Sequence, residues 1–152
     1  MDTQIEEFMY LWHQIMQIDQ DDELKEKYPL LTKLTVNEIS VIDIVASNPH
    51  VILKDICQTL NLPKSTLTNV INTFDKKGYL HRTIAKQDFR SYGLKLTEKG
   101  VQAQKEHLAY ETETCHKVLD SLDAEERSQL FSIVKKILRA YGLDNTNTKD
   151  SH

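Results

Sequence analysis

Apolar residues recur at helical spacing along most of the chain, and one central segment interrupts the pattern. An N-terminal helix of roughly four turns is predicted by apolar residues three and four positions apart, Ile5, Phe8, Met9, Trp12, Ile15 and Met16. Three shorter helices follow, whose predicted inward faces are Ile39, Ile42, Val45 and Ala46, then Leu53, Ile56, Cys57 and Leu60, then Leu67, Val70, Ile71 and Phe74. Beyond the interruption, a helix from Thr97 to about Leu119 precedes a last one with the stripe Leu130, Val134, Ile137, Leu138 and Tyr141.

Capping and helix-breaking residues predict where the central helices begin and end. Thr35 and Glu38 have the spacing of a capping box, so a helix is expected to begin there. Pro49 ends that helix, Pro63 turns the chain into the third short helix, and Gly78 ends the third helix in a left-handed conformation. Two short helices joined by a tight turn form a helix-turn-helix arrangement.

The segment that interrupts the helical pattern predicts a two-stranded β-ribbon. Tyr79 to Ile84 and Gly93 to Leu96 carry β-forming residues. The residues between them, 85–92, are too polar for a core and numerous enough for a hairpin loop. A ribbon directly after a helix-turn-helix predicts a winged-helix fold, mainly α with a small β-ribbon wing.

The tip of this ribbon is basic. Lys86 and Arg90 lie in the loop, and an arginine on a thin projecting loop can enter a DNA minor groove. Asp88 would repel phosphate if left alone, so its expected role is to accept from Arg90 and fix the guanidinium. The alternative is a surface ion pair of little energetic worth.

The outer face of the third short helix is rich in short polar side chains rather than in good helix formers. Exposed helix faces usually carry Glu, Lys and Gln, whereas Ser, Thr and Asn suit base edges and phosphates in a major groove. We therefore interpret this face as a DNA-recognition surface rather than a solvated one. With the following ribbon, the predicted DNA-binding residues are Lys64, Ser65, Thr66, Thr68, Asn69, Asn72, Lys76, Arg82, Lys86, Asp88 and Arg90.

The distribution of charge supports this interpretation, although the net charge of -4 does not. Residues 51–100 carry nine Lys and Arg against four Asp and Glu, a net charge of +5, whereas residues 1–50 and 101–152 carry -7 and -2. A basic middle between acidic flanks is typical of a protein that presents one segment to phosphate.

Other classes of protein find little support in the sequence. No apolar run approaches membrane-spanning length and the N-terminus has no signal-type block, so a cytoplasmic protein without membrane association is expected. Cys57 and Cys115 are far apart and form neither a disulfide framework nor a CxxC motif, although oxidant sensing by either is left open. There is no phosphate loop, nucleophile elbow or HExxH motif, so neither an enzyme nor a cofactor is predicted.

The order of elements and one motif resemble the MarR family of bacterial winged-helix regulators over nearly the whole chain. The motif is Asp88-Phe89-Arg90, then Leu94-Lys95-Leu96-Thr97 and Gly100, with Lys76-Lys77-Gly78-Tyr79-Leu80 before it. The resemblance implies that Lys64 to Lys76 form the recognition helix, that Asp88 and Arg90 pair at the wing tip, and that small molecules, metals or oxidants lower DNA affinity. This chain departs from the family pattern at Asn69, where many members have Arg, and at Pro63, where a Ser cap is common. Asn69 favours adenine over guanine as the target.

Surplus apolar stripes on the terminal helices predict a homodimer, because a winged-helix core does not need them. The predicted organisation is a dimerisation helix and linker in residues 1–30, the winged helix-turn-helix in residues 31–100, two dimerisation helices in residues 101–145 and a disordered tail in residues 146–152. The two recognition helices of such a dimer would meet duplex DNA about one helical turn apart, at a near-palindromic site.

The sequence offers two candidate ligand sites and selects neither. An aromatic effector would lie between the dimer helices and the DNA-binding lobe, with Trp12, Met16 and Tyr28 as contributors. His107, Glu111 and Cys115 are spaced to share a helix face and could bind zinc, but an exposed His–Glu pair is the favoured interpretation. The predicted function is a sequence-specific transcriptional regulator, by default a repressor. The alternative is a winged-helix module that docks a protein.

Overall fold

The computed structural model describes residues 2–17, 26–84 and 92–143 of the 152-residue chain. The chain divides into two compact units, residues 1–112 and 113–152, which are described separately. In chain order the elements are α1 (Thr3–Gln17), the 3-10 helix η2 (Leu31–Lys33), α3 (Val36–Ser47), α4 (Leu53–Leu60), α5 (Lys64–Lys76), β1 (Leu80–Ile84), β2 (Tyr92–Leu96), α6 (Glu98–Leu119) and α7 (Ala124–Ala140). The predicted mainly α fold with a small β-ribbon is confirmed. In the described residues, no helix is long and apolar enough to cross a membrane.

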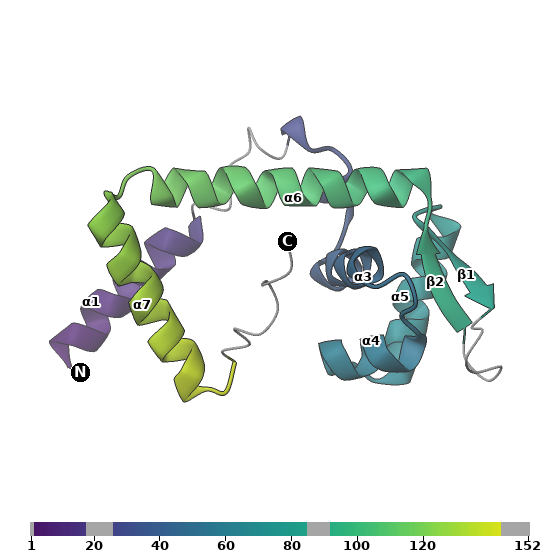
Figure 1. Ribbon diagram of the computed structural model, residues 1–152, viewed down its shortest axis with the longest axis horizontal. Coiled ribbons are helices and arrows are strands. Elements are labelled where there is room, and N and C mark those ends of the chain that lie inside the picture. Colours follow the sequence, from purple (N-terminus) through teal and green to yellow (C-terminus); the bar gives the residue numbers. More distant parts are fainter. Residues whose placement is uncertain (1, 18–25, 85–91, 144–152) are drawn as a thin grey trace. The chain divides into compact units, whose positions relative to one another are not determined.

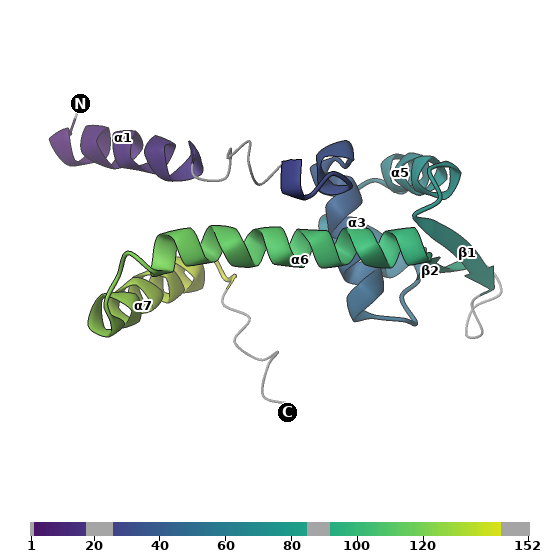
Figure 2. The same cartoon turned by 90° about the horizontal axis from the view of Figure 1, so that it is seen from above.

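Three helices and the ribbon pack around one core in the first unit (Figures 1 and 2). Helices α4 and α5 form the helix-turn-helix, and Asn61 between them adopts a left-handed conformation with φ of 50°. The core is filled by side chains from α3, α4, α5, the ribbon and the start of α6, the largest of which are Tyr79, Phe74, Ile42, Ile56, Leu67, Ile71 and Leu80. The inward faces predicted for α4 and α5 are confirmed.

The inward face predicted for α3 was partly wrong. Val41 is fully buried, whereas Ala46 is exposed and Ile39 is only half-buried. Apolar residues occur on most sides of this helix, so the spacing alone did not select one stripe. The helix buries Glu38 and Val41 in place of Ile39 and Ala46, and it keeps Ile42 and Val45 in the core as predicted.

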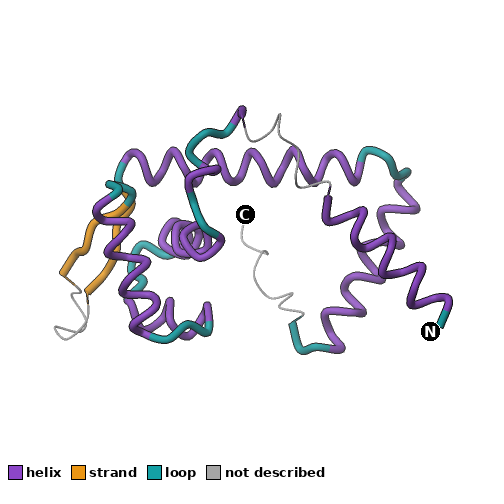
Figure 3. Tube along the Cα trace, turned by 180° about the vertical axis from the view of Figure 1, so that it is seen from behind, coloured by secondary structure: helices purple, strands orange, loops and turns teal. Residues whose placement is uncertain are grey.

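The ribbon is a two-stranded antiparallel sheet that Figure 3 shows in orange. Leu80 pairs with Leu96, Arg82 with Leu94, and Ile84 with Tyr92. These partners share one face of the ribbon, because directly opposed residues point the same way. Tyr92, which the sequence placed in the loop, is the first residue of β2.

The ribbon is locked to the first turn of α6 at one tight junction. The backbone carbonyl of Tyr79 accepts from the backbone N–H of Thr97 at 3.0 Å. The Thr97 hydroxyl donates to the Gly78 carbonyl at 2.7 Å and accepts from the Gly100 N–H at 3.1 Å, so it also caps α6. A Cβ on Gly100 would lie 2.0 Å from the Tyr79 carbonyl oxygen, so only glycine fits there.

A buried carboxylate joins the start of α3 to the end of α5. The predicted capping box is present: the Glu38 N–H donates to the Thr35 hydroxyl and the Glu38 carboxylate accepts from the Thr35 N–H at 2.8 Å. The other carboxylate oxygen accepts from Lys77 Nζ at 2.9 Å. Burial by itself would raise the pKa of Glu38, but the bonds from Lys77 and Thr35 together with the Lys77 charge hold the pKa below its ordinary value of 4.5.

Replacing Glu38 by Gln is expected to lower the free energy of unfolding at neutral pH by about 1–3 kcal/mol, because the Lys77 bond loses its charge. The pKa of Glu38 is lower in the folded state than in the unfolded state. Its stabilisation is therefore complete above pH 4.5 and is lost as the pH falls through the folded pKa. Urea denaturation across pH should show the difference between wild type and Glu38→Gln shrinking in acid. Lys77→Met should reproduce the neutral-pH loss, whereas Lys76→Met, at the exposed neighbouring lysine, should not.

Replacing Gly100 by Ala is expected to cost about 3 kcal/mol, because the added Cβ must displace the Tyr79 backbone or the first turn of α6. Thermal or urea denaturation measures the loss. Glu98→Ala, at an exposed position in the same turn, is the matched control and should change stability little. A Gly100→Ala variant as stable as Glu98→Ala would show that the junction is looser than the structure has it.

Candidate nucleic-acid interface

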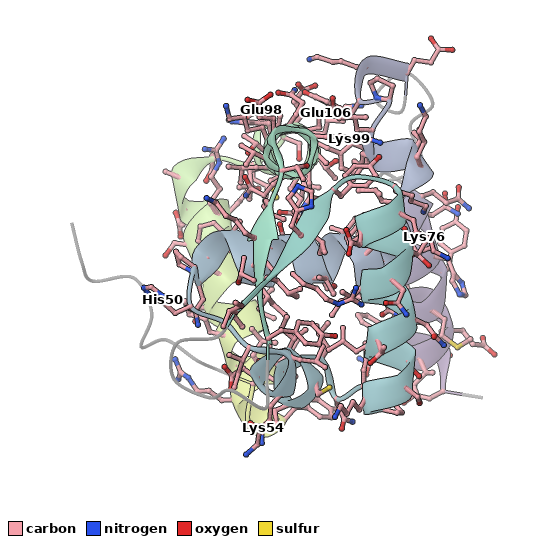
Figure 4. The ribbon with its side chains drawn as sticks, turned by 90° about the vertical axis from the view of Figure 1, so that its right-hand side faces the viewer. His50, Lys54, Lys76, Glu98, Lys99 and Glu106 are labelled. Carbon is pink, nitrogen blue, oxygen red and sulfur yellow. The ribbon has the colours of Figure 1, made fainter. Side chains whose placement is uncertain are left out.

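The outer face of α5 presents the polar residues that the sequence singled out. Leu67, Ile71 and Phe74 are buried on the opposite side, which orients the helix. Of the predicted DNA-binding residues on α5, Thr68 is half-buried and the others are exposed: Lys64, Ser65, Thr66, Asn69, Asn72 and Lys76. Figure 4 shows Lys76 at the surface of α5.

Hydroxyl groups on α5 are partly engaged by the helix itself. Thr68 donates to the Lys64 carbonyl at 2.7 Å and Thr73 donates to the Asn69 carbonyl at 3.0 Å. Each hydroxyl has a single proton, so in this arrangement its remaining capacity is to accept. Cytosine and adenine amino groups are the major-groove donors that such an acceptor fits.

Arg82 on β1 is bonded to two side chains of α5. Its guanidinium donates to an Asp75 carboxylate oxygen at 3.2 Å and to the Asn72 side-chain carbonyl. The guanidinium carbon also lies 5.1 Å from the centre of the Tyr92 ring on β2. The sequence predicted Asn72 and Arg82 separately as DNA contacts, and the structure brings them together. The structure adds Asp75 and Tyr92 to this group. The sequence gave no signal for these two contacts, except that the end of the helix and the ribbon are close along the chain.

Two lysines near the start of the ribbon are held by protein groups. Lys77 is bonded to the buried Glu38, and Lys99 donates to the Lys77 carbonyl at 2.8 Å while its Nζ lies 4.2 Å from the Tyr79 ring centre. The Lys77 side chain therefore supports the contact between α5 and α3, and Lys99 supports the junction between α5, the ribbon and α6. The wing-tip residues Lys86, Asp88 and Arg90 lie outside the described residues, so their predicted pairing and DNA contact stay predictions.

The predicted zinc residues are only partly brought together. His107 Nε2 lies 3.3 Å from Glu111, and His107 Nδ1 lies 3.1 Å from Asp43 on α3. Cys115 is exposed on α6. Within the described ranges, no group of three or more His, Cys, Asp or Glu is arranged to hold a metal ion. His107 and Glu111 form the pair that the favoured interpretation named, but the His107 side chain is only 15% exposed and also contacts Asp43, so the pair is not an exposed one.

Aspartate 43, His107 and Glu111 line a cleft of about 610 Å³ between α3 and α6, which Tyr110 and apolar residues including Val36 and Ile39 complete. Tyr28, one of the predicted effector residues, is buried and packs edge-on against Tyr110 with ring centres 6.2 Å apart. Trp12 and Met16, the other two, are exposed on α1.

Apolar side chains are exposed on both terminal helices. On α1 no described residue is buried, and Phe8 and Trp12 stack on each other with ring centres 6.1 Å apart. On α7 of the second unit, again with no buried residue, the exposed large side chains include Phe131, Ile133, Val134, Ile137 and Leu138. Several large apolar side chains exposed on one helix are typical of a surface that contacts another protein.

Comparison with known proteins identifies the same domain. Residues 34–100 match the family described as "Winged helix DNA-binding domain". Residues 34–100 therefore form a winged-helix domain. The chain is similar to the transcriptional repressor MprA of Escherichia coli strain K12, with 25% identity over 119 residues, which are 76% of this chain and 68% of MprA.

Two solved structures show how far the likeness of this winged-helix fold extends. Streptococcus pneumoniae FabT in complex with DNA gives a TM-score of 0.76 at 21% identity, covering 91% of this chain and 96% of FabT. The Streptomyces coelicolor regulator PcaV in complex with its natural ligand gives 0.56 at 20% identity, covering 77% and 86%. The fold and the resemblance that the sequence indicated are thereby confirmed.

Proposed function

We propose that this protein is a sequence-specific DNA-binding transcriptional regulator that acts as a homodimer, with repression as its default effect. The observation that carries the proposal is the exposed row of short polar side chains on α5, beside the ribbon, within the matched winged-helix domain. The relative MprA is a repressor and the FabT structure contains DNA. We place the regulator in the cytoplasm and assign it no enzymatic activity.

The residues that we propose for DNA contact fall into two groups. Lys64 and Lys76, at opposite ends of α5, carry the positive charge that binds phosphate, and Ser65, Thr66, Thr68 and Asn69 lie between them. Asn72 and Arg82 belong to the same surface but are bonded to each other. Lys86, Asp88 and Arg90 are retained as the proposed wing-tip contact. Residues 1–30 and 101–145 are proposed as the dimerisation segments on either side of the DNA-binding domain 31–100.

An effector is proposed to modulate DNA affinity. PcaV was solved with its natural ligand. In this chain the cleft between α3 and α6 is lined by the apolar side chains of Leu31, Val36 and Ile39 and by the polar groups of Asp43, His107 and Glu111. Tyr28 packs edge-on against Tyr110, which lines the cleft. We propose this cleft as the effector site, with Trp12 and Met16 as further contributors.

Selection of bound duplexes from a randomised library by the purified protein tests the function directly. A dimeric regulator is expected to enrich a near-palindrome whose half-sites lie about one helical turn apart, roughly 34–36 Å. The selection uses near-physiological salt and a chelator, because phosphate binding is strongly salt-dependent. Absence of enrichment by a folded dimer, with and without added zinc, would favour a protein-docking module instead.

Asn69 is expected to determine sequence preference rather than overall affinity. Its amide can both donate to adenine N7 and accept from adenine N6, so Asn69→Ala should relax preference at one base pair of each half-site by about 1–3 kcal/mol. Lys64→Ala is the matched comparison: it should weaken binding to all sequences and lower the salt slope by about one. Equal losses on every sequence from both variants would contradict the assignment of Asn69.

A further inference from the structure

Arg82 is held from three sides, although it lies on an exposed part of the ribbon. Leu80 anchors β1 in the core, whereas the remaining four residues of that strand are exposed. An isolated two-stranded ribbon is marginally stable in water. The bonds from Arg82 to Asp75 and Asn72, with the Tyr92 ring beneath its guanidinium, attach this outer part of the ribbon to α5.

Asp75 is an acidic side chain at the end of the proposed recognition helix. Its carboxylate is 37% exposed and is the sole negative charge on α5. A carboxylate on a surface that meets phosphate weakens binding by simple repulsion. Its ion pair with Arg82 gives it a different role, because a carboxylate bonded to a guanidinium restricts the orientation of the forked group.

Asn72 is constrained by the same contact. Its carbonyl oxygen accepts from Arg82, and a guanidinium can only donate, so this orientation of the amide is fixed chemically. Gripping adenine at N6 and N7 needs both the carbonyl and the amino group of an Asn. The Arg82 bond occupies one of the two lone pairs of the Asn72 carbonyl and fixes its amide toward β1, whereas no such bond orients the Asn69 side chain in the described structure.

We propose that Asp75 and Asn72 hold Arg82 as a positioning residue, which fixes the ribbon against α5, and that Asp75 strengthens DNA binding despite its negative charge. This inference rests on the proposed function, since it concerns the same DNA-binding surface. It assigns Asp75 a role in DNA affinity and gives Asn72 a positioning role toward Arg82 in addition to its place on the DNA-contact surface.

The sign of one substitution separates positioning from plain electrostatics. Asp75→Asn removes a negative charge near phosphate, so repulsion alone predicts tighter DNA binding and positioning predicts weaker binding. We expect Asp75→Asn to weaken binding to the selected duplex about fivefold, and to weaken binding to a scrambled duplex less. Asp75→Glu keeps the carboxylate and is expected to bind within about twofold of wild type.

Glu98→Gln is the matched charge control, because Glu98 is an exposed carboxylate in the first turn of α6 (Figure 4). It should bind the selected duplex at least as tightly as wild type. Arg82→Lys retains the charge but loses the forked geometry, and it is expected to weaken binding about as much as Asp75→Asn. Asp75→Asn and Arg82→Lys disrupt the same ion pair. The variant that carries both changes should therefore bind no more weakly than the weaker-binding of the two single variants.

Fluorescence anisotropy with the selected and scrambled duplexes measures all of these affinities, and thermal denaturation checks that each variant is folded. If the wild type binds the selected duplex and Asp75→Asn binds it equally tightly or more tightly, the inference is wrong and the proposed function stands. Strictly additive losses in the double variant would also overturn the inference. Failure of the wild type to bind any duplex would overturn the proposed function and the inference with it.

Discussion

The DNA-binding half of the molecule depends on the turn formed by Lys77, Gly78 and Tyr79. Lys77 is bonded to the buried Glu38 carboxylate at the start of α3. Gly78 has a positive φ of 76° and ends α5. The Tyr79 carbonyl accepts from the backbone N–H of Thr97, the residue before α6. Three helices and the ribbon therefore share one short segment. Because Gly100 lets the Tyr79 carbonyl approach α6 so closely, the segment from Gly78 to Gly100 has a role in packing, whatever it contacts on DNA.

This arrangement divides the basic residues of the middle segment into two kinds. Lys77, Lys99 and Arg82 are engaged by protein groups. Glu38 partly neutralises the charge of Lys77 and Asp75 that of Arg82, whereas Lys99 is bonded to a backbone carbonyl. Lys64 and Lys76 lie at the two ends of α5. A positive charge counted along the sequence thus overstates what is available for phosphate, and the geometry of the ion pairs decides which lysines and arginines contribute most directly.

The elements that the sequence predicted well are those determined by neighbouring residues. The capping box of Thr35 and Glu38, the left-handed Gly78 and the Thr97 cap each depend on contacts within a few positions or on backbone conformation, and all are present. The orientation of α3 was less predictable, because apolar residues on several sides left the choice to packing.

Contacts between side chains of different elements were the part of the site that the sequence could not provide. Asp75, Asn72 and Arg82 meet because β1 packs beside α5, which brings the third residue of the strand to the end of the helix. The same holds for Asp43 and His107, which are 64 positions apart. Residue type predicted which side chains have the chemistry for binding, and register and strand geometry determined which of them are already engaged.

The terminal helices impose a further condition on function. Neither α1 nor α7 buries a residue within its own chain, and an isolated helix of 15 or 17 residues is marginal in water. In the proposed homodimer a second copy would cover their apolar faces, and association and folding of these segments would then be thermodynamically linked. The same association supplies the second recognition helix. DNA affinity, dimer affinity and the stability of the terminal helices should then vary together, and a ligand that alters one of them acts on all three.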